Sequence, residues 1–177
     1  PDPLGVVEKH GADALRLYML ASPAVRGDDL CFSEAGVERT LRQTLIPLWN
    51  AYSFFVTDAR IYNAQPNEKM VEPQEEMDRW ILSRTSSLVQ KVEEAMERYA
   101  LDEATELFIP FFDELTNWYI RRNRRRFWSD EESLSRQEAF STLYIVFKTC
   151  IKTLAPFAPY ITDLIWSNLR RPEEPIS

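Results

Sequence analysis

The apolar residues of this chain recur mostly at steps of three and four positions, the spacing that places them on one face of an α-helix. Five or six amphipathic helices are predicted in this way, and no strand or internal repeat is apparent. The expected helices cover residues 11–19, 33 to about 59, 75–99, 102 to about 128, 135–154 and 160–169. The pattern therefore predicts an all-α fold, built as a helical bundle with short connections.

Particular residues mark where these helices should begin or bend. Ser33 and Asp102 are expected N-caps, because a side-chain oxygen there accepts hydrogen bonds from backbone N–H groups of the first turn. The segment starting at Ser135 has the spacing of a capping box. Pro47 and Pro110 interrupt helical patterns and are expected to kink them.

Most large apolar residues of these stripes are expected in the core. The third helix should bury Trp80 and, at its end, Tyr99, and the fourth should bury a run of phenylalanines together with Tyr119. The polar stretch 63–73 contains two prolines and is the clearest internal loop.

Residues 117–128, the arginine segment, concentrate cations and aromatic rings. Five of these twelve residues are arginine and four are aromatic. The whole chain carries a formal charge of −7, so any nucleic acid would have to bind a local basic patch. Arginines beside exposed rings suit single-stranded nucleic acid, because they offer charge for phosphates and flat faces for bases.

A regular α-helix turns about 100° per residue, which divides the arginine segment into faces. With Leu115 at the centre of the buried side, Arg122 and Arg126 stay near the core. A structural role is predicted for both, either beyond the end of the core or paired with acids from another helix. The residues expected on one exposed flank are Trp118, Arg121, Arg125 and Trp128, whereas Arg124 should point away from the core.

A second interpretation of the arginine segment stays open. Its arginines could instead complement the negative C-terminus of the helix dipole and pair with Asp130, Glu131 and Glu132.

Catalytic and metal-binding side-chain groups are not expected in this chain. His10 is the only histidine, and it does not make a zinc site with the well-separated Cys31 and Cys150. The four glycines lack the spacing of a phosphate-binding loop. No apolar run could span a bilayer, and the two cysteines are typical of reduced thiols, so we expect a cytoplasmic protein without a membrane partner.

The arginine segment and several flanking motifs together resemble the isoleucyl-tRNA synthetase family. Asn117-Trp118-Tyr119-Ile120-Arg121-Arg122, followed by Arg124-Arg125-Arg126-Phe127-Trp128, is similar to the signature of the anticodon-binding domain of that family. The motifs shared more widely among class I synthetases are Ala12-Asp13-Ala14-Leu15-Arg16, Trp49-Asn50-Ala51-Tyr52, Asp78-Arg79-Trp80-Ile81-Leu82-Ser83-Arg84 and Ala155-Pro156-Phe157-Ala158-Pro159. A valyl-type anticodon domain and a non-enzymatic protein-interaction module are the alternatives.

The resemblance implies that the chain grips the anticodon stem-loop of an isoleucine tRNA. The implied tRNA-binding residues are Asn117, Trp118, Arg121, Arg124, Arg125 and Trp128, while Asp13 and Arg16 are expected to fix structure. Residues 1–30 resemble the stem-contact segment that follows the catalytic domain, 31–170 the anticodon-binding bundle, and 171–177 a linker to a missing C-terminal region.

The catalytic motifs of the family, HIGH and KMSKS, are absent from this sequence. The resemblance therefore implies that isoleucine–tRNA ligation takes place in other domains of a parent chain, which are also expected partners. ATP and magnesium are expected only in that parent, with zinc possible in its C-terminal region.

Overall fold

The computed structural model describes residues 2–66, 73–128 and 133–170, and every regular element in them is helical. The elements are α1 (Pro3–His10), α2 (Ala12–Leu20), η1 (Pro23–Arg26), α3 (Glu34–Thr40), η2 (Leu41–Leu45), α4 (Ile46–Ile61), α5 (Glu76–Glu97), α6 (Leu101–Glu106), α7 (Phe108–Asp113), η3 (Glu114–Ile120), α8 (Arg121–Phe127), α9 (Leu134–Leu154) and α10 (Pro159–Leu169). Here η1 is a 3-10 turn, and η2 and η3 are π-helical. The all-α fold is confirmed, although five or six helices is too low a count.

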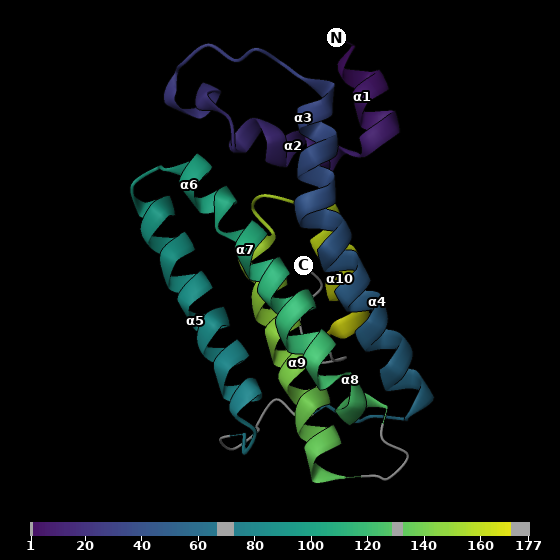
Figure 1. Cartoon of the computed structure of the whole chain (residues 1–177). Coiled ribbons are helices and arrows are strands. Elements are labelled where there is room, and N and C mark those ends of the chain that lie inside the picture. The colour runs from purple at the N-terminus through teal and green to yellow at the C-terminus, as the bar shows by residue number, and fades with distance from the viewer. Residues whose placement is uncertain (1, 67–72, 129–132, 171–177) are drawn as a thin grey trace.

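The long helices form a bundle with a short cap at one end (Figure 1). α5 packs against α9, and α9 also contacts α4, α8 and α10. α1 and α2 lie across the end of the bundle, where α2 contacts α3, α6 and α10. Residues 171–177, the expected linker, lie outside the described residues.

An aromatic cluster joins α4, α8 and α9 in the core. The Phe127 ring lies 5.3 Å from that of Phe54 and 5.2 Å from that of Phe140, both nearly perpendicular to it. Phe127 and Phe140 are buried, and each buried phenylalanine contributes about 1.5–3 kcal/mol through the hydrophobic effect. Phe127 therefore anchors the end of the arginine segment in the core.

Pro47 follows a change of helix type, and Pro110 follows a break in the helix. Each lies in the first turn of its helix, α4 or α7. The preceding turn would clash with the proline ring in a regular helix. Before Pro47, the preceding turn is the π-helical segment η2. Before Pro110, the helix is interrupted at Leu107, between α6 and α7.

Of the predicted N-caps, Ser33 is confirmed and Asp102 is wrong. Ser33 Oγ accepts a hydrogen bond from the backbone N–H of Gly36 at 3.3 Å, at the start of α3. α6 begins at Leu101, so Asp102 lies within its first turn. The Asp102 carboxylate instead accepts from Nε of Arg26 at 2.7 Å, a partner that local sequence does not reveal.

The predictions for Ser135 and Tyr99 are also wrong. α9 begins at Leu134 and its cap is Ser133, two residues before the expected cap, with Ser133 Oγ accepting from the N–H of Arg136 at 3.1 Å. Tyr99 is 85% exposed. Its φ of 58° lies in the left-handed region that ends helices, so its side chain leaves the buried stripe of α5.

Asp13 and Arg16 have the structural role expected of them. The Asp13 carboxylate accepts hydrogen bonds from the N–H groups of Tyr160 at 3.3 Å and Ile161 at 2.7 Å, and so caps α10. Nη2 of Arg16 donates to the carbonyl of Pro156 at 2.9 Å. Both residues thus fasten α2 to the start of α10.

Asp13→Ala is expected to lower the free energy of unfolding by about 1 kcal/mol, because two N–H groups of α10 lose their acceptor. Thermal unfolding followed by circular dichroism measures the change. Asp13→Asn is the matched control, since it keeps a side-chain acceptor and should lose less. Equal losses in the two variants would show that the cap is not the cause.

Candidate nucleic-acid interface

The arginine segment covers the end of η3 and all of α8. Tyr119, Ile120, Asn123 and Phe127 are its buried residues. The buried stripe therefore continues from Tyr119 to Asn123 and Phe127. A regular helix would instead place Arg122 and Arg126 near the core, as the sequence analysis predicted.

The π-helical form of η3 explains this change of face. A π turn holds about one residue more than an α turn, so residues beyond η3 are turned by about 100° relative to a regular helix. Phe127 follows Phe108 by 19 positions, which would carry it about 100° from the buried stripe in a regular helix. The extra residue cancels that drift. The predicted division into buried and exposed residues is therefore correct up to Leu115 and wrong for the residues after η3.

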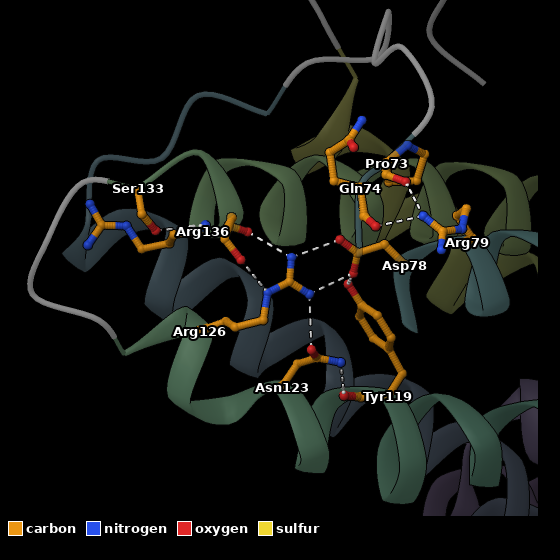
Figure 2. Close-up of polar contacts among 10 residues, drawn as sticks. Pro73, Gln74, Asp78, Arg79, Tyr119, Asn123, Arg126, Ser133 and Arg136 are labelled. Atoms are coloured by element: carbon orange, nitrogen blue, oxygen red, sulfur yellow. Dashed lines mark hydrogen bonds and ion pairs between the residues drawn. The ribbon is translucent and has the colours of Figure 1, made fainter. Parts of the chain in front are cut away.

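Arg126 forms the centre of a buried network that joins α5, η3, α8 and α9 (Figure 2). Its guanidinium donates from Nη1 to Oδ1 of Asp78 at 2.9 Å and from Nη2 to Oδ2 at 2.8 Å. It also donates to the side-chain oxygens of Asn123 at 3.0 Å and Ser135 at 2.8 Å. The hydroxyl of Tyr119 donates to Oδ1 of Asp78 at 2.6 Å. We call these five residues the Asp78 clamp.

The Asp78 clamp is shielded from water. Asp78 and Tyr119 are fully buried, and the side chain of Arg126 is 17% exposed. Burial raises the pKa of Tyr119 well above its usual value, and the negative charge of Asp78 raises it further. The hydroxyl therefore stays protonated and remains a donor. Arg126 thus pairs with an acid of another helix, as expected of a structural residue.

Arg122 does not occupy the structural position expected of it. Its side chain is exposed, and its guanidinium carbon lies 4.4 Å from the centroid of the Trp118 ring. No ion pair is found for it within the described part of the chain. Trp118 and Arg122 line a groove of about 670 Å³ between α5 and η3, together with Met77, Trp80 and Pro110 and the acids Glu76, Asp113 and Glu114.

Trp128 and Arg124 lie on the side of α8 that faces α4. Trp128 Nε1 donates to Oδ2 of Asp58 at 3.2 Å, and the guanidinium carbon of Arg124 lies 5.7 Å from the Trp128 ring. Trp118, by contrast, borders α5. The prediction that Trp118 and Trp128 share one flank is therefore wrong, and the extra residue in η3 is again the reason.

Arg121 and Arg125 point outward between these two flanks. Both are exposed, and neither has an ion-pair partner among the residues that the structure describes. Asn117 is exposed too, and its Nδ2 donates to Oδ1 of Asp113 at 2.6 Å. The six residues for which tRNA binding was predicted are thus all exposed. The alternative partners Asp130, Glu131 and Glu132 lie outside the described residues.

The buried role of Asp78 was not predicted from the sequence, although the pattern of buried residues in α5 contains a signal for it. Asp78, Ile81, Thr85, Leu88, Val92 and Ala95 are the buried residues of α5. Asp78 therefore begins a stripe with helical spacing. A charged residue in such a stripe indicates a buried partner, because an unpaired charge is costly to bury. The partners themselves, 41 and 48 positions away, could not be read from the sequence.

The environment of Asp58 predicts a pH dependence of stability. Burial raises the pKa of Asp58, while the hydrogen bond from Trp128 and the charge of Arg124 lower it, and the net shift is upward. A carboxyl with a raised folded-state pKa stabilises the fold fully below its unfolded pKa, and this contribution is lost as the pH rises through the folded pKa.

Asp58→Asn, which cannot ionise, should therefore gain stability relative to the parent as the pH rises from acidic to neutral. Urea unfolding at a series of pH values measures the difference. A constant difference across the series would contradict this interpretation of Asp58.

Within residues 2–66, 73–128 and 133–170, no three His, Cys, Asp or Glu side chains lie close enough to hold a metal ion. None of the described helices is long and apolar enough to cross a bilayer.

The chain is similar in sequence to a known protein family and to two curated proteins. A family described as the anticodon-binding domain of tRNA ligase matches residues 78–176. The whole chain is 53% identical to isoleucine–tRNA ligase of Protochlamydia amoebophila (strain UWE25) and 48% identical to that of Chlamydia pneumoniae. It spans only 17% of the length of each of these relatives.

A similar fold occurs in a solved structure, the LeuRS–tRNA–LeuAMS ternary complex of Agrobacterium radiobacter K84. The match has a TM-score of 0.69 and covers 98% of this chain and 20% of the other. At 20% sequence identity, it shows a shared fold.

Proposed function

The chain belongs to the family of anticodon-binding domains of tRNA ligases, and from this premise we propose that it binds the anticodon stem-loop of isoleucine tRNA. The parent protein is then an isoleucine–tRNA ligase, and this domain holds the tRNA while its acceptor end reaches a catalytic domain elsewhere in that protein.

The observation that carries this proposal is the outward surface of the arginine segment. Arg121, Arg122, Arg124 and Arg125 are exposed on an acidic protein, and none has an ion-pair partner among the described residues. Four arginines without carboxylate partners are suited to phosphates, which they can bind through charge-assisted hydrogen bonds. We call this surface, with Trp118 and Trp128 at its borders, the RNA face.

The two tryptophans give the RNA face a second kind of contact. Trp118 and Trp128 are each about half exposed, one on either side of the arginines. Unpaired bases of an anticodon loop can stack on such rings or on guanidinium planes. Arginines would thus hold the loop backbone while the tryptophans receive bases that it turns outward.

The relatives favour isoleucine over the other candidates. The similarity to isoleucine–tRNA ligases extends over the whole chain, which supports neither a valyl-type domain nor a general protein-interaction module. We also propose that ATP, magnesium and any zinc bind in the remainder of the parent protein. We also propose a cytoplasmic location, consistent with the free thiols of Cys31 and Cys150.

Fluorescence anisotropy with a labelled isoleucine anticodon stem-loop tests the proposal. We expect binding whose affinity falls steeply as salt increases, because arginine–phosphate contacts release counterions. A stem-loop with the same stem and an unrelated anticodon is the control for recognition of the bases. Absence of binding to either RNA at low salt would refute the proposal.

A further inference from the structure

The π-helical segment η3 determines on which side of α8 Arg122 lies. In a regular helix continued from Leu115, Arg122 would lie about 20° from the centre of the buried side, whereas one extra residue places it about 120° away. The structure shows the second arrangement, with Arg122 exposed above the Trp118 ring. Membership of Arg122 in the RNA face therefore depends on the π form of η3.

A π-helical turn needs support from outside the helix, since isolated chains prefer the α form. Tyr119, within η3, has such support, because its hydroxyl donates to Oδ1 of Asp78 on α5 at 2.6 Å. The same carboxylate binds Arg126, two turns further along, through both of its oxygens. One buried group of α5 thus fixes a residue within η3 and another in α8.

The Asp78 clamp is compatible with only one register. With the extra residue in η3, Tyr119 and Arg126 both point toward α5 and meet Asp78 (Figure 2). If η3 became α-helical, both side chains would turn by about 100° and could not reach the same carboxylate. The clamp therefore stabilises the π form selectively.

We propose that Asp78, acting through Tyr119 and Arg126, is a positioning residue for RNA binding. It holds η3 in the π form and thereby keeps Arg122 on the RNA face. This inference rests on the proposed function, because the ligand of that face is the anticodon stem-loop. Asp78 itself is fully buried and does not touch RNA.

A double-mutant cycle between Tyr119→Phe and Arg122→Ala tests the inference. Tyr119→Phe removes only the hydroxyl that binds Asp78. Binding of the labelled isoleucine anticodon stem-loop is measured over a range of salt, at a temperature where circular dichroism shows every variant folded. In the chain without Tyr119→Phe, Arg122→Ala should reduce the slope of log K against log salt, the salt slope, by about 0.7. This is the value for one phosphate contact on a single strand.

In the Tyr119→Phe background, Arg122→Ala should have a smaller effect, because the α-helical register, in which Arg122 leaves the RNA face, becomes more populated. Arg121→Ala should weaken binding equally in both backgrounds, since Arg121 points outward in either register, about 140° from the buried side with the extra residue and about 120° without it. An undiminished effect of Arg122→Ala in the Tyr119→Phe background would overturn the inference. Failure of the parent to bind the stem-loop would instead refute the proposed function on which the inference rests.

Tyr144→Phe is the matched control for loss of a buried hydroxyl. Tyr144 is also buried, and its hydroxyl donates to the carbonyl of Leu169 at 2.9 Å, away from the RNA face. It should lower stability without changing the salt slope. Asp78→Asn provides a second way to weaken the Asp78 clamp, and a folded Asp78→Asn variant with the parental slope would also overturn the inference.

Discussion

Replacing Asp78 with alanine is expected to lower the free energy of unfolding by about 3–5 kcal/mol. The carboxylate is fully buried and accepts hydrogen bonds from Arg126 and Tyr119. Its removal leaves the Arg126 side chain, which is only 17% exposed, without its counter-charge, and the Tyr119 hydroxyl without this acceptor. Urea unfolding followed by circular dichroism, extrapolated linearly to water, measures the loss.

Glu114→Ala is the matched control, because the Arg84–Glu114 ion pair also starts from α5 and joins it to η3, which is continuous with α8. Nε and Nη2 of Arg84 donate to the two Glu114 oxygens at 2.7 and 2.9 Å, so its geometry is also bidentate. The side chains are 39% and 25% exposed, however, and pairs near water contribute about 1 kcal/mol or less. Equal losses in Asp78→Ala and Glu114→Ala would contradict the importance of burial.

The fold class could be predicted because helical spacing is a local property of the sequence. Ser33 and its helix, and the helix at 160–169, were predicted nearly to the residue, since each depends on neighbours within one or two turns. The concentration of exposed cations and rings in residues 117–128 is equally local. These features required no knowledge of which helices pack together.

The faces of the arginine segment could not be predicted, because their cause is tertiary. The π form of η3 is supported by a carboxylate 41 positions earlier in the chain, and nothing within residues 114–120 announces it. A single extra residue in a turn then moved Arg122 outward and separated Trp118 from Trp128. Arg126 still pairs with an acid of another helix, as predicted, because the extra residue directs its side chain toward α5, which carries Asp78.

Replacing Arg121, Arg122, Arg124 and Arg125 together with glutamine is expected to abolish the salt-sensitive part of RNA binding. Each arginine that binds a phosphate contributes about 0.7 to the slope of log K against log salt on a single strand, so the four account for about 3. Affinity at low salt should fall accordingly, while the fold is retained because all four side chains are exposed. Anisotropy with the isoleucine anticodon stem-loop over a salt series measures both quantities.

Net charge alone could weaken RNA binding, since the variant carries −11 where the parent carries −7, four positive charges having been removed. A control with the same −11 removes four exposed arginines elsewhere, namely Arg26, Arg39, Arg42 and Arg98. If the RNA face binds phosphates directly, this control keeps nearly the parental salt slope, because distant charges are screened beyond about 10 Å at 0.1 M salt. Equal losses in the two variants would mean that the overall field of the protein, and not the RNA face, governs binding.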